Sequence, residues 1–348
     1  MKIWNRPLKI GLVGATGVVG ETFINLIEEF NQPVAELRPF ASSNSEGQKL
    51  NLGGQDWTVQ VLKPNCFDGL DMVFFSSGDD ISKQWAPLAV QAGAVAIDNS
   101  NAFRMSSEIL LIVPEVNGHL LNSSADSKAT TRLDIKPKPQ IISNPNCSTI
   151  QLVVALGPLA QNFGLEEVIV STYQAVSGAG LPGYEELLNQ TQNFQDMDHQ
   201  SKAFPKQILF NCIPQIGSFD QDGFCTEEAK IMNETKKIMN LPDLKISAFT
   251  VRVPALNSHS EAVWVTLKTE AISKQQILNA LGDSEGLAVM DQDYPTPLEV
   301  SGEEPVFVGR IHQDIANPKR WLMWVVADNL KKGAALNGLQ IAELLFCD

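Results

Sequence analysis

Cys147 is the side chain in this sequence whose surroundings best suit covalent chemistry. It lies in Ser143-Asn144-Pro145-Asn146-Cys147-Ser148-Thr149, after the apolar pair Ile141 and Ile142 and before an apolar run with helical spacing. Asn-Pro favours a turn and Ser-Thr favours a helix start. We therefore expect Cys147 between a strand end and a helix start, where free backbone N–H groups and the helix dipole favour a thiolate. The same N–H groups could hold an oxyanion after attack on a carbonyl. The alternative is a buried structural cysteine.

A cysteine nucleophile needs a partner that transfers protons near neutral pH, and histidine is the usual one. Arg252 to Ser260 is predicted to be a loop between two strands of a second domain, and His259 lies in it. Arg252 opens this loop, and its planar guanidinium suits a carboxylate. The alternative for His259 is a solvated surface side chain. No comparable setting surrounds the other three histidines, which are His119, His199 and His312.

A glycine-rich turn lies near the N-terminus. The apolar stretch Lys9 to Val13 predicts a strand, Gly14-Ala15-Thr16-Gly17-Val18-Val19-Gly20 follows, and Phe23 to Ile27 continues as an apolar helix face. Strand, glycine turn and helix together are typical of a dinucleotide site, because the helix start and the exposed backbone can receive a pyrophosphate. A plain tight turn is the alternative.

The next predicted strand, Glu36 to Ala41, ends in Ser42-Ser43-Asn44-Ser45-Glu46-Gly47. NAD sites usually place an acid at this strand tip to bind the ribose 2′-hydroxyl. The tip is rich in hydroxyls and lacks such an acid unless Glu36 or Glu46 reaches it, which favours NADP. No Lys or Arg lies within the serine cluster, and the direction of Arg38 is open. NAD is therefore not excluded.

Predicted strands and helices alternate regularly between Lys9 and Cys147. A strand from Asp71 to Phe75 ends in the small residues Ser76, Ser77 and Gly78, a helix is predicted over 82–92, and a strand follows over 94–100. This rhythm predicts a parallel sheet with right-handed crossovers. The polar stretch 122–139 is expected to be a surface loop.

Beyond Cys147 the pattern changes to long strands over 167–175, 244–254 and 261–269, which indicates a mixed or antiparallel sheet. The turn 177–180 is expected to be flexible, and a helix should run from Thr226 to about Met239. A final apolar helix over 333–346 is expected to pack on the first domain. The fold class is therefore α/β: a Rossmann-type doubly wound parallel sheet over 1–145, completed by about 327–348, and an α+β domain with a mixed sheet over 146–326.

Composition narrows the function classes. A chain of 348 residues suggests two domains, and a net charge of -14 argues against a broad nucleic-acid surface or binding to anionic membranes. No apolar run reaches membrane-spanning length. Five cysteines without a C-x-x-C pair predict a reducing, cytoplasmic location with no disulfide framework and no zinc site.

Six stretches together resemble aspartate-semialdehyde dehydrogenase, in the expected order from about Lys9 to Leu345. They are Gly14 to Gly20, Asp98-Asn-Ser-Asn-Ala-Phe-Arg104, Ser143 to Thr149, Gln174-Ala-Val-Ser-Gly-Ala-Gly180, Arg252-Val-Pro through His259-Ser260, and Asp328-Asn-Leu-Lys-Lys-Gly-Ala-Ala-Leu-Asn337. The resemblance implies a homodimer that performs NADPH-dependent reductive dephosphorylation of L-4-aspartyl phosphate to L-aspartate 4-semialdehyde. This step belongs to the biosynthesis of lysine, threonine, methionine and diaminopimelate.

The resemblance also implies roles for single residues. Cys147 would form the thioacyl enzyme, His259 would be the acid/base, and Gln174 would orient the substrate beside the nucleophile. The residues implied to bind substrate are Arg252 (carboxylate), Glu227 (ammonium), Lys230 with Arg104 (phosphate) and Asn146. The residues implied to bind the cofactor are Gly14, Thr16, Gly17, Val18, Val19, Ser42, Ser43, Ser45, Ser76, Gly78, Ser177, Gly178 and Asn329. Because Glu227 and Lys230 are three residues apart on a predicted helix, they should share one face.

Two features depart from the family pattern. Asn44 stands where the family often has a basic residue, and 123–137 is longer and more polar than usual. Two alternatives stay open: an N-acetyl-glutamyl-phosphate reductase, which uses the same cysteine and acyl-phosphate chemistry, and a non-catalytic relative that binds or assembles. The Asn-Pro-Asn-Cys-Ser-Thr and Arg-Val-Pro to His-Ser stretches favour the aspartyl substrate. The presence of Cys147 and His259 argues against the non-catalytic relative.

Overall fold

The computed structural model describes residues 1–122, 137–195 and 201–347 and divides into two units. Unit 1 comprises 1–145 with 334–348, and unit 2 comprises 146–333. Most of the polar stretch expected to be a surface loop, and His199, lie outside the described residues.

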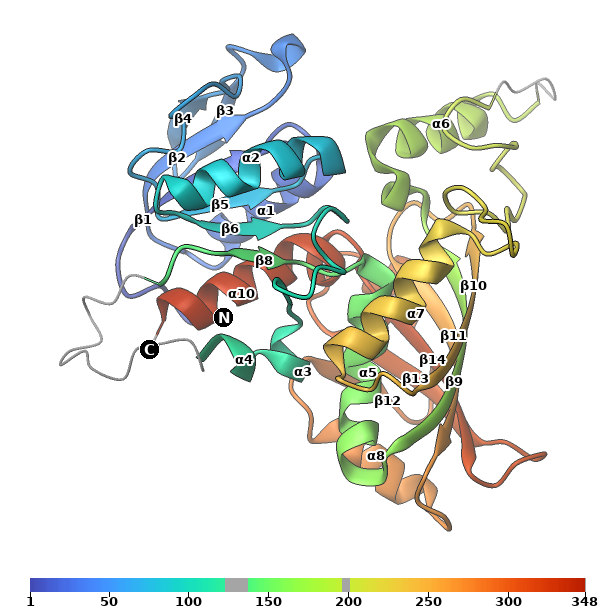
Figure 1. Cartoon of the computed structure of the whole chain (residues 1–348). Helices are drawn as coiled ribbons and strands as arrows, with labels where there is room; N and C mark the ends of the chain where they lie inside the picture. The colour runs from blue at the N-terminus through green and yellow to red at the C-terminus, as the bar shows by residue number, and fades with distance from the viewer. Residues whose placement is uncertain (123–136, 196–200, 348) are drawn as a thin grey trace. The chain divides into compact units, whose positions relative to one another are not determined.

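Unit 1 is built on a six-stranded sheet in the order β2-β1-β5-β6-β8-β7, with all neighbours parallel (Figure 1). The strands are β1 (Leu8–Val13), β2 (Val34–Phe40), β5 (Met72–Phe75), β6 (Val95–Asp98), β7 (Leu110–Leu111) and β8 (Ile141–Ser143), and β3 (Lys49–Leu52) and β4 (Gln55–Thr58) form a separate hairpin. The helices are α1 (Val18–Glu29), α2 (Asp79–Gln91), α3 (Pro114–Asn117), α4 (His119–Asn122) and α10 (Leu336–Phe346). The predicted doubly wound parallel sheet is confirmed.

The core of unit 1 explains why its strands read as continuous apolar runs. All four residues of β5 are buried, since helices cover both faces of a parallel sheet. The Phe74 ring stacks on Phe23 of α1 with ring centroids 4.4 Å apart. The final helix, α10, contributes Leu336, Leu339 and Ile341 to the same core. The C-terminal segment therefore completes a core that begins at the N-terminus.

Unit 2 contains a six-stranded mixed sheet in the order β10-β9-β11-β14-β13-β12. Its strands are β9 (Leu165–Gln174), β10 (Lys245–Arg252), β11 (His259–Leu267), β12 (Leu287–Met290), β13 (Val306–Gln313) and β14 (Arg320–Ala327). β9 is parallel to β10 and antiparallel to β11, which confirms a mixed sheet. Its helices are α5 (Cys147–Phe163), α6 (Gly180–Gln192), α7 (Thr226–Ile238), α8 (Lys274–Gly282) and α9 (Pro297–Val300). In Figure 1, α5, α7 and α8 lie along one face of this sheet.

Three local expectations were wrong. His259 is the first residue of β11 and is fully buried rather than part of a loop, because the turn ends at Ser258 (φ 68°) and the ladder to β14 starts immediately. The segment Val176–Ala179 forms a 3₁₀ helix rather than a flexible turn. The last helix is preceded by a π-helical turn, Lys331–Ala335, so α10 starts three residues later than expected. No helix in the described ranges is long and apolar enough to cross a membrane.

Candidate active site

Cys147 is the first residue of α5, as the turn and helix signals predict. Asn146 caps the helix: its Oδ1 accepts hydrogen bonds from the backbone N–H groups of Ser148 (3.0 Å) and Thr149 (3.2 Å). These two N–H groups therefore already have an acceptor, and the expectation that they would hold an oxyanion is wrong. Gly333 packs against the cysteine, because a Cβ at 333 would lie 2.9 Å from the Cys147 Cβ.

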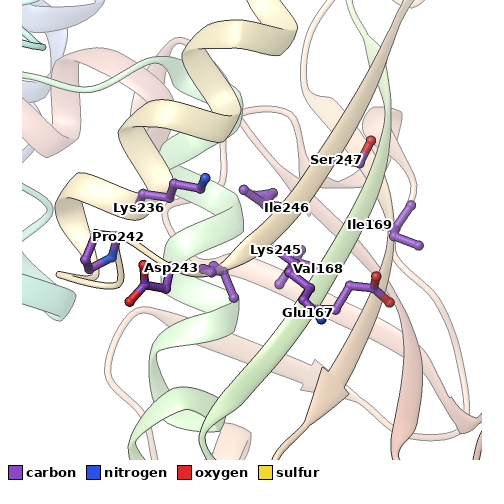
Figure 2. Close-up of a pocket in the computed structure, with 10 residues that line it drawn as sticks. Glu167, Val168, Ile169, Lys236, Pro242, Asp243, Lys245, Ile246 and Ser247 are labelled. Carbon is purple, nitrogen blue, oxygen red and sulfur yellow. The ribbon is translucent and has the colours of Figure 1, made fainter.

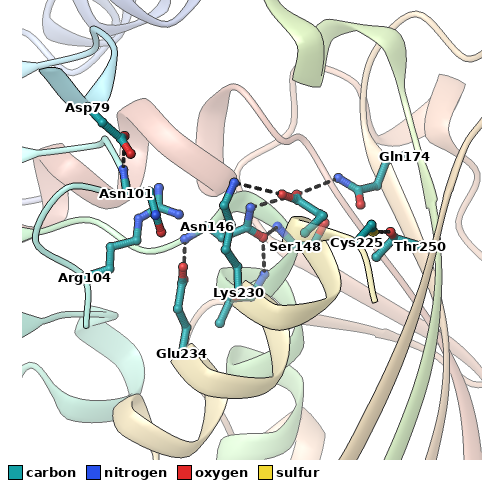
Figure 3. A network of polar contacts seen from close by, with 12 residues as sticks. Asp79, Asn101, Arg104, Asn146, Ser148, Gln174, Cys225, Lys230, Glu234 and Thr250 are labelled. Atoms are coloured by element: carbon teal, nitrogen blue, oxygen red, sulfur yellow. Dashed lines mark hydrogen bonds and ion pairs between the residues drawn. The ribbon is translucent and has the colours of Figure 1, made fainter. Parts of the chain in front are cut away.

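The Glu227 carboxylate, in the first turn of α7, is the centre of the polar network in unit 2. Figure 3 shows Asn146, Gln174 and Lys230 gathered around one carboxylate, and all three donate to Glu227: Asn146 Nδ2 at 2.8 Å, Gln174 Nε2 at 3.1 Å and Lys230 Nζ at 3.2 Å. Burial raises the pKa of Glu227, but the Lys230 charge and the amide donors outweigh it and lower that pKa to about 2. Glu227 is therefore a fixed negative charge, and its pairing with Lys230 agrees with their shared helix face.

Two contacts hold the donors to Glu227 in place. The Thr172 hydroxyl donates to Gln174 Oε1 at 3.1 Å, so the amide nitrogen of Gln174 is directed to Glu227. Glu234, one helical turn after Lys230, accepts from the backbone N–H of Asn146 at 2.7 Å (Figure 3). The side chain of Asn146 is therefore held at both of its polar atoms: Oδ1 accepts from the start of α5, and Nδ2 donates to Glu227.

Arg252 and His259 are both held by the Ala175 peptide. Arg252 Nη1 donates to the Ala175 carbonyl oxygen at 2.5 Å, and His259 Nδ1 accepts from the Ala175 N–H at 3.0 Å. Gly178 lies over both side chains, since a Cβ there would be 2.8 Å from Arg252 Nη1 and 3.0 Å from His259 Nε2. Burial lowers the pKa of Arg252, and the charges of Glu227 and Cys147 offset this in part.

The hydrogen bond from Ala175 also fixes the form of the His259 ring. Because Nδ1 accepts a hydrogen bond, the neutral ring carries its hydrogen on Nε2. Burial, and then the Arg252 charge, lower the pKa of His259 to about 3. The ring is thus a neutral donor whose Nε2 has no hydrogen-bond partner among the described residues.

Ser177 and Asn329, both predicted to lie near a nicotinamide, are brought together in unit 2. The Ser177 hydroxyl donates to Asn257 Oδ1 at 3.0 Å and accepts from Asn329 Nδ2 at 3.1 Å. Asn329 Oδ1 accepts from the Ser258 N–H at 2.9 Å, directly before His259. This cluster therefore joins the 3₁₀ turn, the strand start at His259 and the segment after β14.

The glycine turn of unit 1 fits a dinucleotide. Gly14 has φ 84°, and a Cβ there would lie 2.7 Å from the Ser76 carbonyl oxygen, so only glycine allows this approach of two strand ends. Gly17 is the N-cap of α1 and no side chain caps that helix, which suits its start to a pyrophosphate. Thr16 Oγ1 lies 3.4 Å from Ser45 Oγ in the serine cluster.

The other predicted cofactor residues of unit 1 follow the strand ends. Ser42 and Ser43 lie where β2 passes into the 3₁₀ turn Ser43–Ser45, and Gly78 is the N-cap of α2. Val18 and Val19 open α1. All of them therefore lie at carboxyl ends of strands or at helix starts, where doubly wound sheets bind ligands.

Two basic residues of unit 1 have settings that the sequence left open. Arg38 donates to the Glu36 carboxylate at 2.5 Å and to the carbonyl oxygens of Cys66 and Asp68, so Arg38 and Glu36 are paired with each other and the partners of Arg38 lie outside the serine cluster. Arg104 is buried, and its guanidinium donates to the carbonyl oxygens of Asn144 and Asn99, both at 2.9 Å. Arg104 is thus buried and held by backbone carbonyl groups that follow β6 and β8.

A separate hollow of about 430 Å³ in unit 2 contains none of the predicted site residues (Figure 2). It lies where α7 meets the start of β10 and is lined by Glu167, Val168, Ile169, Lys236, Pro242, Asp243, Leu244, Lys245, Ile246 and Ser247. Acidic and basic side chains both line this hollow, so its charge does not indicate one class of ligand.

Sequence reasoning missed four supporting residues: Thr172, Glu234, Asn257 and Gly333. Thr172 could have been found, because side chains two apart on a strand share a face and Gln174 was already a candidate. Glu234 lies one helical turn beyond Lys230, which is also a readable spacing. Asn257 and Gly333 gave no comparable signal, since their contacts join segments far apart in the chain.

The fold and the site define a semialdehyde dehydrogenase class of oxidoreductase. The family "Semialdehyde dehydrogenase, NAD binding domain" matches residues 9–124, and "Semialdehyde dehydrogenase, dimerisation domain" matches 156–332. Cys147 lies in the segment between the two matches.

Individual relatives narrow this class. Aspartate-semialdehyde dehydrogenase of Aquifex aeolicus (strain VF5) is 46% identical over 97% of each chain, and that of Bacillus subtilis (strain 168) is 42% identical over 98% of each. The chain belongs to the aspartate-semialdehyde dehydrogenase family, which confirms the resemblance read from its motifs.

Solved structures agree. Aspartate semialdehyde dehydrogenase II of Vibrio cholerae, complexed with ASA, superimposes with a TM-score of 0.91 at 39% identity over 98% of each chain. The Candida albicans enzyme with NADP matches with a TM-score of 0.75 at 27% identity over 97% of this chain and 98% of that one.

Proposed function

We propose that the chain catalyses the NADPH-dependent reductive dephosphorylation of L-4-aspartyl phosphate to L-aspartate 4-semialdehyde and phosphate. The observation that carries the proposal is the grouping in unit 2 of a helix-start cysteine, a buried guanidinium, a neutral imidazole and an ionised carboxylate. An amino-acid acyl phosphate requires such a set: a nucleophile, and one group for each of its charges.

Cys147 attacks the acyl carbon, the acyl–oxygen bond to phosphate breaks, and a thioacyl enzyme forms. The α5 dipole and the Arg252 charge favour the thiolate that this attack requires. Lys230 and Arg104, each held in place by its own contacts, are proposed to bind the departing phosphate.

The substrate's amino-acid end is proposed to bind between opposite charges. Arg252 pairs with the α-carboxylate, and Glu227 accepts the α-ammonium group. Because its pKa is lowered to about 2, Glu227 stays ionised throughout the pH range of metabolism. Gln174 and Asn146 act by holding that carboxylate in place.

His259 is proposed to act on the acyl oxygen. With Nδ1 occupied by the Ala175 N–H, the ring offers its Nε2 hydrogen to the oxygen that gains negative charge in each tetrahedral state. The role of acid/base implied by the resemblance is thereby narrowed to a hydrogen-bond donor. This donor replaces the helix N–H groups that Asn146 already caps.

The cofactor is proposed to bind unit 1 through the glycine turn and the serine cluster, with Ser177, Gly178 and Asn329 facing the nicotinamide. NADPH, when bound, supplies the hydride that reduces the thioacyl carbon. The chain then restores the Cys147 thiolate as the hemithioacetal releases the aldehyde. With no acid among residues 42–45, the site favours the 2′-phosphate form, and NAD stays open because no Lys or Arg lies there and Glu46 follows directly.

The reverse reaction tests this proposal. With aspartate semialdehyde and phosphate, we expect NADP reduction, and a parallel assay with N-acetyl-glutamate semialdehyde should give none. Cys147→Ser should keep NADP binding and lose turnover by several orders of magnitude, because a hydroxyl is not ionised at neutral pH. Near-normal turnover in that variant, or equal rates with both semialdehydes, would contradict the proposal.

The assembly is proposed to be a homodimer formed through unit 2. The sheet face away from α5 and α7 presents Ile169, Tyr173 and Phe249, of which Phe249 is 57% exposed, and Tyr173 contacts the Trp324 ring. An apolar sheet face of this kind suits a second copy of the chain. Phe249→Arg should shift the protein towards monomer in sedimentation velocity.

We also propose a cytoplasmic location, which five free thiols support.

A further inference from the structure

A second polar row lies behind the catalytic side chains of unit 2. The strand register places Arg252, Gln174 and His259 side by side on the helix-facing side of β10, β9 and β11. The next residues on the same face form a second row: Thr250 and Thr172 lie two residues before Arg252 and Gln174, and Glu261 lies two residues after His259. Thr172 already supports the first row through its bond to Gln174. The role of Glu261 is not explained by the mechanism above.

Glu261 is paired in space with Gln151. Gln151 lies one helical turn after Cys147 on α5, which packs on β11, and Glu261 lies two residues after His259. Both are buried, with exposures of 0% and 1% for Glu261 and Gln151. Neither carboxyl oxygen of Glu261, and neither side-chain polar atom of Gln151, has a hydrogen-bond partner among the described residues. The Gln151 amide is nevertheless close enough to lower the pKa of Glu261, so the two buried groups lie beside each other without a well-formed hydrogen bond.

Among the described residues, the strand and helix neighbours of Glu261 carry no charge. Its neighbours are Thr172 on β9, Val325 on β14 and Gln151 on α5, none of which titrates. On these elements the titratable groups are His259, two residues before Glu261 on β11, and Cys147, one turn before Gln151 on α5. Burial raises the pKa of Glu261 well above its ordinary value, and Gln151 offsets this only in part. Burial without a cationic partner therefore favours the neutral form of this carboxyl group.

A neutral acid and a primary amide are complementary. The acid offers one O–H donor and one carbonyl acceptor, and the amide offers N–H donors and one carbonyl acceptor, so the two groups can close a pair of hydrogen bonds. We propose that protonated Glu261 and Gln151 form a clamp that ties the start of α5 to β11 and thereby sets the distance between the Cys147 sulfur and the His259 ring. Glu261 is a positioning residue, and its neutrality keeps a negative charge from forming behind the thiolate.

This inference rests on the proposed function, and the test is arranged so that the two can fail separately. Wild type must first reduce NADP with aspartate semialdehyde and phosphate. If it does not, the proposed function fails, whereas the alkylation rate of Cys147 and the infrared spectrum still decide on the clamp.

The key variants are Glu261→Leu and Glu261→Gln. Leu removes the polar pair, and we expect kcat/KM and the rate of Cys147 alkylation by iodoacetamide to fall roughly 10- to 100-fold, since a misplacement of about 1 Å can lower a rate about 100-fold. The melting temperature should fall as well, because the substitution leaves the amide of Gln151 buried without its partner. Gln keeps a donor and an acceptor, so kcat/KM should stay within about threefold of wild type.

Val265→Ala is the matched control. Val265 is buried and lies four residues after Glu261 on β11, on the same face of the sheet. This substitution should also lower the melting temperature but leave kcat/KM within about twofold, so that a loss of stability alone is distinguished from a loss of the clamp. If Glu261→Leu does not fold, Gln151→Met tests the same pair from the helix and should lower kcat/KM likewise.

Infrared difference spectroscopy between wild type and Glu261→Gln supplies the second readout. The carbonyl stretch of a protonated carboxylic acid should be present in wild type and absent in the variant. The absence of this band from wild type would contradict the protonated state proposed for Glu261. Wild-type kcat/KM and alkylation rates in Glu261→Leu, or a loss of activity that merely follows melting temperature across all variants, would overturn the clamp.

Discussion

Replacing Glu227 by Gln should remove a pH-dependent part of the stability of unit 2. Gln keeps the shape of the side chain but removes the charge that Lys230 faces at 3.2 Å and that Asn146 and Gln174 hold through their amides. The buried Arg252, whose pKa the Glu227 charge raises, loses the same partner. The substitution therefore tests whether the network is organised by an ionised carboxylate.

The expected size follows from the pKa. A fall from 4.5 to about 2 corresponds to roughly 3 kcal/mol of stabilisation at about 1.4 kcal/mol for each unit. The folded pKa of Glu227 is depressed, so the unfolded chain binds this proton first as the pH falls. The stabilisation is complete above the unfolded pKa and is lost as the pH falls through the folded one. About 2 kcal/mol of it should disappear between roughly pH 5 and pH 3.

Urea unfolding at several pH values measures this contribution. The difference in unfolding free energy between wild type and Glu227→Gln should be largest near neutral pH and should shrink by about 2 kcal/mol between roughly pH 5 and pH 3. Other titrating groups, including His259, are present in both proteins and largely cancel in the difference. Glu285→Gln is the control, because that carboxylate is exposed on the connection between α8 and β12 and should give no such trend.

Parallel stability curves for wild type and Glu227→Gln across this range would refute the reasoning. They would mean that Glu227 is protonated in the folded chain or that its partners do not favour the charge. In that case its assignment as the ammonium acceptor would fail as well.

Other consequences can be checked by kinetics and unfolding. Asn146→Ala removes the α5 cap and should destabilise the chain by about 1 kcal/mol in urea unfolding, with slower alkylation of Cys147; unchanged values for both would contradict the cap's role. Gly178→Ala places a Cβ 2.8 Å from Arg252 Nη1 and 3.0 Å from His259 Nε2, so kcat/KM should fall about tenfold or more in steady-state assays while the melting temperature changes little. Because burial and the Arg252 charge lower the pKa of His259 to about 3, the pH profile of kcat should show no histidine limb near the ordinary value of 6.5. A limb there that disappears in His259→Gln would show that the ring titrates during the reaction.

The parallel sheet of unit 1 was predictable because its signals are local. Each strand is a short apolar run, and Gly14 marks a turn that only glycine can adopt against Ser76. The start of α5 at Cys147 was equally readable, since a polar cap precedes a long apolar run. Motif order, rather than periodicity, indicated the family.

Contacts within the site were less predictable. His259 was expected in a loop, and it begins β11 because a turn with positive φ at Ser258 brings the chain directly into the ladder. The N–H groups after Cys147 were expected to be open, yet Asn146 folds back onto two of them. The first error arises from backbone geometry that several residues set together, whereas the second overlooks the local preference of Asn for helix N-caps.

By itself, the sequence determined which segments become strands and helices, where the nucleophile falls and which charges accompany it, because these follow from side-chain chemistry over a few neighbouring residues. Only the tertiary structure decided that Glu227 receives three donors, that the Ala175 peptide holds both Arg252 and His259, and that Glu261 lies behind them. Those relations depend on the register between strands far apart in the chain, and a shift of one residue would turn each side chain to the other face of the sheet.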